Sequence, residues 1–310
     1  MKLHILLAIG LCSSISVWAQ HDEHIATPKG QPAVAARFGE GITPGAVKQQ
    51  LEVVAGAAMQ GRETATEGQQ RAAGYIISQF SKAGLQPGAQ GRWEQYFYLY
   101  QDTLTAGKIV LDGHTYNFGK DYYSSLYACQ DQQLKASRVI FAGYGIRTDT
   151  YNDYANLDVT GQVVLLLPGE PHKNDTTFLL TETRRPSVWG GISKKLTELM
   201  EQKPAAVLVV NEGAARMEKV SGSNLYKTPT YMRKPQQAAA YTSNVYYISP
   251  EMAAGLLGIK DAGTLLESAT ADKLKPRVVK KPVQVLFKKE VKQLRSSNVL
   301  GYLEGTDKKK

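Results

Sequence analysis

Residues 163–167 read VVLLL, five consecutive apolar side chains with no polar residue between them. An unbroken apolar run of this length is typical of a strand buried on both faces of a parallel sheet. Two further runs share the pattern, RVIFAG at 138–143 and AAVLVV at 205–210. Residues 192–202 have helical periodicity and lie between the runs at 163–167 and 205–210. The sequence therefore predicts a strand–helix–strand unit of the α/β class.

A first helix is expected to begin at Thr43-Pro44, because threonine caps a helix N-terminus well and proline suits the first helical position. Its apolar face consists of Val47, Leu51, Val54 and Ala58. A second helix is expected from Thr66, with Gln69 completing a capping box and Gly84 ending the helix in a left-handed conformation. Its buried stripe is predicted to comprise Ala73, Ile76, Ile77 and Phe80.

The remaining elements are predicted mostly as strands. Asp112-Gly113 is a favourable pair for the turn of a hairpin over 109–118. Residues 212–241 are polar and irregular, which indicates a surface excursion. The other predicted elements are strands at 93–100, 246–248, 283–287 and 298–303 and a helix at 250–257. The strands at 93–100 and 298–303 are expected to present open edges, which favour self-association.

The N-terminus has the pattern of an export signal. Lys2 precedes an apolar run from Ile5 to Ile15, and Ala19 follows a small-x-small cleavage pattern, so residues 1–19 are predicted to be a signal peptide. Residues 20–41 are rich in Ala, Pro and Gly and are expected to form a disordered leader. No later run is apolar enough to span a bilayer, so the mature protein is expected to be secreted or periplasmic, with no membrane partner.

Charge and cysteine content exclude several function classes. The chain of 310 residues carries a formal net charge of +9, and a basic strip accounts for much of it: Lys273, Lys275, Arg277, Lys280, Lys281, Lys288, Lys289, Lys292 and Arg295. The strip lacks interleaved aromatic residues, so a solvated strand face is favoured over a nucleic-acid site. Cys129 is the only cysteine after the signal peptide, and we expect it to be a small core residue.

A search for catalytic and metal-ligating residues finds no complete set. The donor-rich stretch His21-Asp22-Glu23-His24 lies in the leader, and His114 and His172 have no ligand at helical spacing. Four carboxylates could serve acid–base chemistry, namely Glu63, Asp153, Asp158 and Glu170, but their spacing suits turns and helix caps equally well. The residues predict no catalytic group and no metal ligand in this chain, and they assign no substrate-binding residue.

Three stretches together resemble the secreted zinc aminopeptidases related to glutamate carboxypeptidase and the transferrin receptor. The first is GRETATEG at 61–68 with the helix that follows it, although Ala65 stands where the family favours glycine. The second comprises 141–146, 151–155, 157–164 and 205–211, and is similar to the protease-associated (PA) domain inserted into many of these peptidases. The third is NVLGYLEGTD at 298–307, which resembles the strand and turn before the family's first metal-bearing strand.

The resemblance implies a β-rich PA-like domain inserted into an incomplete α/β zinc-peptidase domain. Residues 42–104 would supply the leading helices and first strand of the peptidase domain, and 283–310 its further strands. Residues 105–282 would form the PA-like insertion. The family's His-x-Asp motif and its other metal ligands would follow Lys310, so the resemblance implies two zinc ions in the full-length protein and none bound by this chain.

By the same resemblance, the protein is expected to hydrolyse N-terminal residues of peptides, with the PA-like domain limiting which substrates enter. Its partners would be peptide substrates and the C-terminal peptidase region. The loops at 143–145 and 212–241 would face the cleft, or else Gly143 and Gly145 only shape a turn and the long loop is surface variation. Two alternatives stay open: a non-catalytic binding homologue, and a carbohydrate-binding protein suggested only by the 17 tyrosines.

Overall fold

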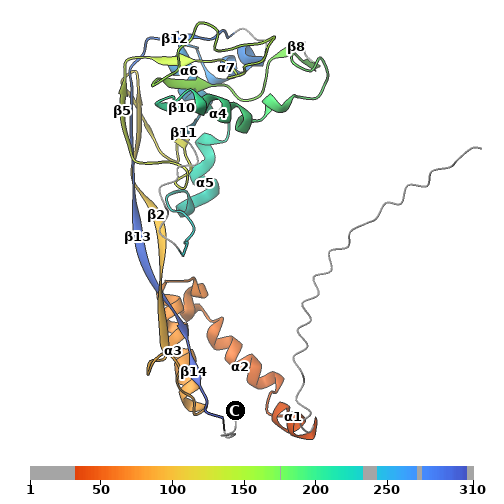
Figure 1. Cartoon of the computed structure of the whole chain (residues 1–310), viewed down its shortest axis with the longest axis vertical. Helices are drawn as coiled ribbons and strands as arrows, with labels where there is room; N and C mark the ends of the chain where they lie inside the picture. The colour runs from red at the N-terminus through yellow and green to blue at the C-terminus, as the bar shows by residue number, and fades with distance from the viewer. Residues whose placement is uncertain (1–31, 175, 233–242, 271–273, 306–310) are drawn as a thin grey trace, which may run out of the picture. The chain divides into compact units, whose positions relative to one another are not determined.

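Figure 1 shows the computed structural model of the protein, which describes residues 32–174, 176–232, 243–270 and 274–305. The predicted signal peptide and residues 20–31 of the predicted leader lie outside the described residues. The chain forms two compact units, which meet in sequence between Met59 and Gln60.

The first unit is helical. Helix α2 spans Pro44–Val54, and its N-cap Thr43 accepts a hydrogen bond from the Ala46 amide at 3.1 Å, which confirms the predicted helix start. None of its residues is buried. Helix α1 spans Pro32–Gly39, where a disordered leader was expected. Three alanines in eight residues explain the difference, since alanine has the highest helix propensity.

The second unit is built on a six-stranded sheet with the strand order β12-β6-β7-β10-β11-β4, so the fold is a mixed α/β structure as predicted. The four central strands are parallel, and the two edge strands are antiparallel to their neighbours. The sheet comprises β12 (Arg277–Val279), β6 (Val139–Phe141), β7 (Val163–Leu166), β10 (Ala206–Val210), β11 (Asn244–Ile248) and β4 (Tyr122–Tyr123). Every residue of β6, β7 and β10 is buried, which confirms the interpretation of the apolar runs.

Each face of this sheet is covered by a different layer. Helix α4 (Ile192–Glu201) covers one face, where Leu196 and Leu199 pack against side chains of β6, β7 and β10. On the other face, helix α6 (Pro250–Leu257) and an antiparallel sheet pack against the alternate side chains of the same strands. Helix α7 (Ala262–Thr270) packs beside α6. We call residues 105–287, with these two cores, the body.

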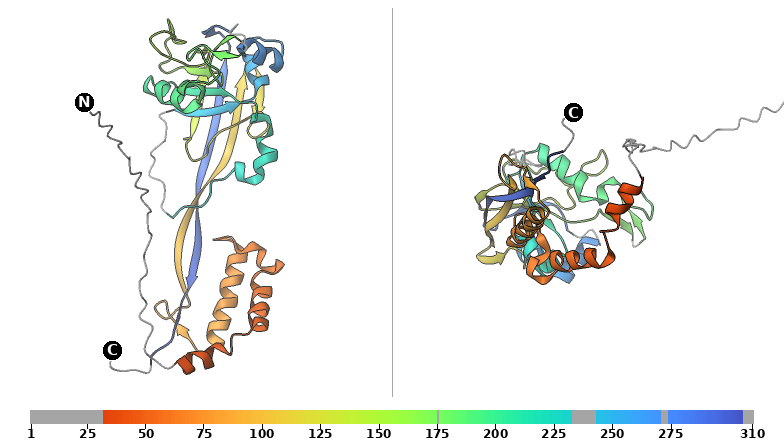
Figure 2. Two further views of the ribbon diagram at one scale, coloured as in Figure 1. Left: turned by 90° about the vertical axis from the view of Figure 1, so that its right-hand side faces the viewer. Right: turned by 90° about the horizontal axis from the view of Figure 1, so that it is seen from below.

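The antiparallel sheet has the order β3-β2-β13-β5 and contains two unusually long strands, β2 (Glu94–Leu111) and β13 (Val283–Val299). They pair from Val283↔Leu111 to Val299↔Glu94 and twist about one another, as Figure 2 shows. We call this pair the ribbon. The other two strands are β3 (His114–Asn117) and β5 (Gln132–Ala136), and the predicted turn at Asp112-Gly113 joins β2 to β3.

The ribbon corrects two sequence predictions. Residues 283–287 and 298–299 belong to one strand rather than two. The charged segment between them pairs with β2 through backbone hydrogen bonds, and it has no apolar alternation from which a strand could be predicted. The strand predicted at 93–100 is not open on both edges, because β13 pairs with one edge of residues 94–100. Strand β14 (Gly301–Tyr302) pairs with β1 (Gln86–Pro87).

Helix α3 (Glu67–Lys82) packs on the ribbon, and Gly84 ends it with the predicted left-handed conformation at φ +81°. Ala73 of the predicted stripe is buried, but Ile76 is 37% exposed. A side chain at Gly301 would collide with Leu85 and Phe80, so glycine is required where the end of α3 meets β14.

The predicted surface excursion is partly structured. It contains α5 (Met217–Ser221), and Tyr231 then exchanges two backbone hydrogen bonds with Tyr100 on the outer edge of β2. Residues 233–242 lie outside the described residues. The remaining elements are η1 (Ala57–Arg62), β8 (His172–Asn174), β9 (Thr177–Phe178), η2 (Val188–Gly190), η3 (Ala214–Arg216) and η4 (Gly222–Leu225).

The predicted domain boundary at 282/283 coincides with the start of β13, whereas the boundary at 104/105 falls inside β2. Within the described ranges, no helix combines the length and the apolar character that crossing a bilayer requires.

Candidate functional site

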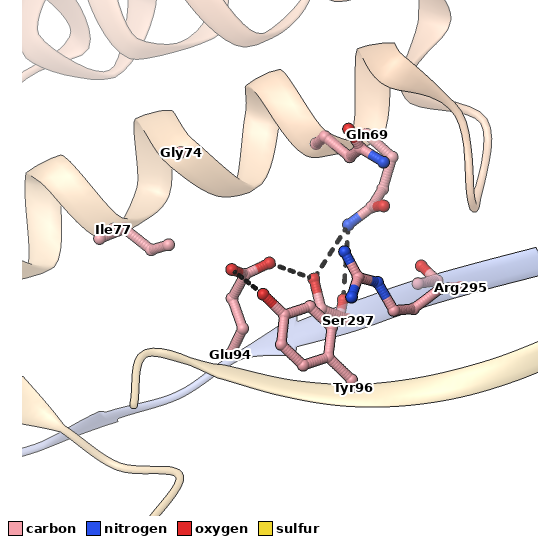
Figure 3. A pocket seen from close by; sticks show the side chains of 9 residues that line it. Gln69, Gly74, Ile77, Glu94, Tyr96, Arg295 and Ser297 are labelled. Atoms are coloured by element: carbon pink, nitrogen blue, oxygen red, sulfur yellow. Dashed lines mark hydrogen bonds between the residues drawn. The ribbon is translucent and has the colours of Figure 1, made fainter. Parts of the chain in front are cut away.

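One pocket lies where α3 packs alongside the ribbon, and we call it the α3–ribbon pocket (Figure 3). It has a volume of about 200 Å³. Its lining comprises Gln69, Gln70, Gly74 and Ile77 from α3, and Glu94, Tyr96, Arg295, Ser296 and Ser297 from the two strands. The sequence analysis assigned none of these residues to a site.

Cross-strand register brings the polar side chains of the ribbon to one face. Tyr96 pairs with Ser297, and the next rows pair Glu94 with Val299 and Tyr98 with Arg295. Residues directly opposite each other in an antiparallel pair point to the same side, as do alternate residues along a strand. Glu94, Tyr96 and Arg295 therefore share the face that Figure 3 shows below α3.

Hydroxyl groups hold the carboxylate of Glu94 in place. The Tyr96 hydroxyl donates to Glu94 Oε2 at 2.7 Å, and the Ser297 hydroxyl donates to Oε1 at 2.8 Å. The hydrogen bond to Glu94 raises the pKa of Tyr96 above its ordinary value. The guanidinium of Arg295 lies over the Tyr96 ring, 4.6 Å from its centroid.

Gln69 closes the pocket from α3. Its amide nitrogen donates to the carbonyl and the hydroxyl of Ser297, both at 3.5 Å. The predicted capping box is thus only half formed. Thr66 accepts from the Gln69 backbone amide at 3.4 Å, but the Thr66 amide donates to the Glu63 carbonyl instead of to the Gln69 side chain. Gln69 Oε1 is buried and has no hydrogen-bond partner within the described structure.

A second group of polar side chains is buried in the body, beyond the carboxyl ends of β6 and β7. Lys195 of α4 is fully buried, and its ammonium donates to the carbonyls of Gly169 and Leu167. Asp153 accepts the Ile146 amide at 3.1 Å and the Tyr151 hydroxyl at 2.9 Å. Glu170 accepts the amide of Ser187 at 2.6 Å and its hydroxyl.

Burial shifts the pKa values of Asp153 and Lys195 in the directions that disfavour charge. Desolvation raises the pKa of Asp153 to about 6, against the opposing effect of its hydrogen bonds and of Lys195. Desolvation also lowers the pKa of Lys195 to about 8, and the nearby carboxylates of Asp153 and Glu170 oppose that shift. The three groups form one electrostatic cluster.

The structure sorts the four carboxylates singled out from the sequence. Asp153 and Glu170 come together around Lys195, whereas Asp158 only caps the turn at Thr160, whose amide it accepts at 2.9 Å. Glu63 is exposed. Sequence reasoning missed Lys195, although it sits at a core position of the helical stripe formed with Ile192, Leu196 and Leu199.

Gly143 and Gly145 border the Asp153 side of this cluster. Both have positive φ, +52° and +70°, and a Cβ on Gly143 would lie 2.7 Å from Asp153 Oδ1. These glycines shape a tight turn, as one of the two sequence interpretations proposed.

Metal donors do not gather within the described residues, which contain no group of three or more His, Cys, Asp and Glu side chains. His114 begins β3, and His172 begins β8, where its ring stacks on Phe178 at 4.5 Å. The stretch His21–His24 lies outside the described residues. Cys129 is a core residue as predicted, and burial raises the pKa of its thiol.

Comparisons with known proteins add little. No family model matches the chain, and no curated protein matches it. Among solved structures, a peptidase M28 precursor from Shewanella amazonensis is similar at a TM-score of 0.29 and 9% identity, over 78% of this chain and 48% of that one. The chain thus spans about half the length of that protein, at a TM-score below the level of a shared fold.

Proposed function

We propose that this chain is the substrate-recognition region of an exported zinc aminopeptidase, and that its body limits which peptides reach the catalytic centre. The observation that carries the proposal is topological. The β2 and β13 strands pair from Glu94–Val299 to Leu111–Val283, so the body at 105–287 leaves and returns side by side. An insertion with adjacent ends folds around its own core and can be added to a neighbouring domain without disturbing it.

The sequence stretches that resemble zinc aminopeptidases fit this arrangement. Residues 61–68 lead into the first turn of α3, and 298–303 end the ribbon and include β14, so both peptidase-like stretches lie at the end of the ribbon that carries α3. The PA-like stretches at 141–146 and 157–164 contribute β6 and β7 of the body. The proposal therefore assigns recognition to the body and catalysis to residues that would bind metal outside it.

The described residues do not fit a two-zinc site, because their histidines lie on separate strands and Cys129 has a thiol of raised pKa. A zinc pair in the complete enzyme would polarise the scissile carbonyl and activate a water molecule. This chain's own contribution would be to select and orient the peptide.

The product of the whole gene should release N-terminal residues from unblocked peptides in the presence of zinc. A chelator should abolish this release, and N-acetylated peptides should not be cleaved. The 310-residue chain alone should release nothing under the same conditions and should bind no stoichiometric zinc. Peptide binding by the zinc-loaded gene product without any release would refute the enzyme and favour a non-catalytic binding protein. Equal rates on short peptides and on folded substrates would refute the gating role.

A further inference from the structure

We propose that the α3–ribbon pocket binds a free α-amino acid, with the ammonium group on Glu94 and the carboxylate on Arg295. The site stands on its own side chains and does not depend on whether the chain belongs to a peptidase.

Glu94 is prepared to accept an ammonium group. Its two carboxylate oxygens are fixed by the Tyr96 and Ser297 hydroxyls at 2.7 and 2.8 Å, and each oxygen keeps a further lone pair for a ligand. No Lys or Arg among the described residues pairs with it. A half-buried carboxylate held in this way attracts a cation more strongly than a freely rotating surface carboxylate, because less conformational entropy is lost on binding.

Arg295 is prepared to bind a carboxylate. Its guanidinium rests on the Tyr96 ring at 4.6 Å from the centroid, and none of the described residues accepts a hydrogen bond from it. A guanidinium presents its donors as a planar fork that matches both oxygens of a carboxylate. Stacking on the ring fixes the direction of that fork before the ligand arrives.

The separation of the Glu94 and Arg295 charges favours a ligand that carries both a positive and a negative group. Glu94 and Arg295 lie in cross-strand rows that are separated by the row of Tyr96 and Ser297, and they form no ion pair with each other. Figure 3 shows Glu94 at the hydroxyl end of Tyr96 and Arg295 at the ring. A simple anion would meet the repulsion of Glu94 and a simple cation that of Arg295. A zwitterion satisfies both groups.

The size and the other walls of the pocket restrict the ligand to one residue. The volume of about 200 Å³ lies below the range of about 300–1,000 Å³ that drug-sized ligands occupy. Ile77 supplies an apolar wall, and Gly74 contributes no side chain beside it. Gln69 Oε1, buried and without a partner in the described part of the chain, is a further acceptor beside the Ser297 end. An aliphatic amino acid such as leucine matches these walls.

Isothermal titration of the 310-residue chain with L-leucine tests the proposal. We expect saturable binding of one ligand per chain. N-acetyl-leucine lacks the ammonium group and leucinamide lacks the carboxylate, so each should bind at least roughly tenfold more weakly, since a charge-assisted hydrogen bond is worth about 1.5–3 kcal/mol. These comparisons need no change to the protein and are independent of any folding defect.

Variants locate the site. Glu94→Gln and Arg295→Gln should each weaken leucine binding at least roughly tenfold. Glu290→Gln and Lys292→Gln change charges of the same two signs on β13, outside the pocket lining, and should leave the affinity unchanged. Absence of saturable binding, equal affinity for N-acetyl-leucine, or equal loss in the control variants would each overturn the proposal. None of these results bears on zinc-dependent peptide hydrolysis, so the two proposals fail separately.

Discussion

Lys195 shows how much a single side chain can depend on its surroundings. It is fully buried on α4, and its ammonium reaches the carbonyls of Leu167 and Gly169, which follow β7. A buried ammonium is tolerated only with hydrogen-bond acceptors and nearby negative charge, which the carbonyls, Asp153 and Glu170 provide. Lys195 shares the helical stripe of Ile192 and Leu196, but its partners come from the loops that follow β6 and β7, so periodicity alone could not identify the cluster.

Asp153 should make the stability of the protein depend on pH. Its pKa is raised from 3.8 to about 6 in the folded state, so the folded protein holds this proton more tightly than the unfolded chain does. As pH rises from 3.8 to about 6, the free energy of unfolding should therefore fall, by about 3 kcal/mol for a shift of this size. Above pH 6 the cost is fully present and the curve is flat with respect to this group.

Urea unfolding at a series of pH values measures this dependence. The Asp153→Asn variant keeps one acceptor for the Ile146 amide and has no carboxyl to titrate, so its curve should be flatter than that of the wild type over this interval. Asp158→Asn is the matched control. Asp158 is exposed, and the Thr160 amide lowers its pKa below 3.8, so its own contribution changes only at lower pH. Parallel curves for wild type and Asp153→Asn would contradict the assignment.

At the scale of elements, the ribbon contains a β-bulge that no sequence pattern indicates. The register shifts between Lys288 and Lys289, where Thr105 of β2 has no partner, and this bulge brings Asp102 to the face on which Lys289 continues the alternation of Phe287. Its ammonium pairs with Asp102 Oδ2 at 2.7 Å, and Asp102 also accepts the Tyr231 hydroxyl. Sequence analysis placed Lys289 in a solvated basic strip, which is wrong for this residue, since its side chain is only 16% exposed.

Removal of Lys289 should destabilise the protein markedly. Lys289→Met leaves the 4% exposed side chain of Asp102 charged and unpaired, a change that costs about 3–5 kcal/mol for buried pairs. Lys292→Met is the matched control, because the ion pair of Lys292 with Glu290 is half exposed on both sides and such pairs contribute about 0–1 kcal/mol. Thermal and urea denaturation compare the two variants. Equal losses of stability in the two variants would contradict a larger contribution from the Asp102–Lys289 pair.

The outer edge of β13 follows from the same register. The backbone N–H and C=O of Tyr100 bond to Tyr231, so they point away from β13, and Tyr100 and Gln293 form a pair without hydrogen bonds to each other. The backbone N–H and C=O of Gln293 therefore point away from β2. Val291 and Arg295 share that orientation. Strand β5 pairs with this edge only at 283–287, so among the described residues no strand pairs with it at 291–295, where the charges of Lys292 and Arg295 oppose pairing with another chain.

Neutralising that edge should promote self-association. The double variant Lys292→Val and Arg295→Val presents β-branched apolar residues beside unpaired backbone groups, so we expect oligomers in light scattering at concentrations where the wild type shows none. Lys108→Val with Lys120→Val removes the same charge away from this edge and is the control. Oligomers in both double variants would indicate a general loss of solubility.

The sequence predicted elements better than their pairing. Apolar runs identified β6, β7 and β10, because a strand that is buried on both faces has apolar residues at consecutive positions. The length of the ribbon was missed, since residues 288–297 are held by hydrogen bonds to β2 and carry no apolar alternation. The same reason hid the α3–ribbon pocket, whose lining residues come from 69–77, 94–96 and 295–297 and meet only through the packing of α3 and the cross-strand register.

At the scale of the second unit, both hydrophobic cores lie between Leu104 and Phe287. The contacts that close them come from the body itself, including Ile109 and Leu111 from the start of the ribbon and Val283, Val285 and Phe287 from its return. A region that contains its whole core and has adjacent ends can fold independently. The outer part of the ribbon, residues 94–103 of β2 and 288–299 of β13, adds backbone pairing but no member of either core.

A fragment of residues 100–292 should therefore fold on its own. It keeps the two cores and the Asp102–Lys289 pair, and we expect a single cooperative melt and dispersed amide resonances. A matched fragment of residues 112–282 lacks Ile109, Leu111, Val283 and Phe287, each 2% exposed or less in the structure, and should not fold. Limited proteolysis of the 310-residue chain should leave a stable product with ends near the longer fragment's. Cooperative folding of both fragments would show that residues 100–111 and 283–292 do not belong to the core, because their apolar side chains would then contribute nothing to whether the body folds. Folding of neither would contradict the inference that the body contains everything its cores need.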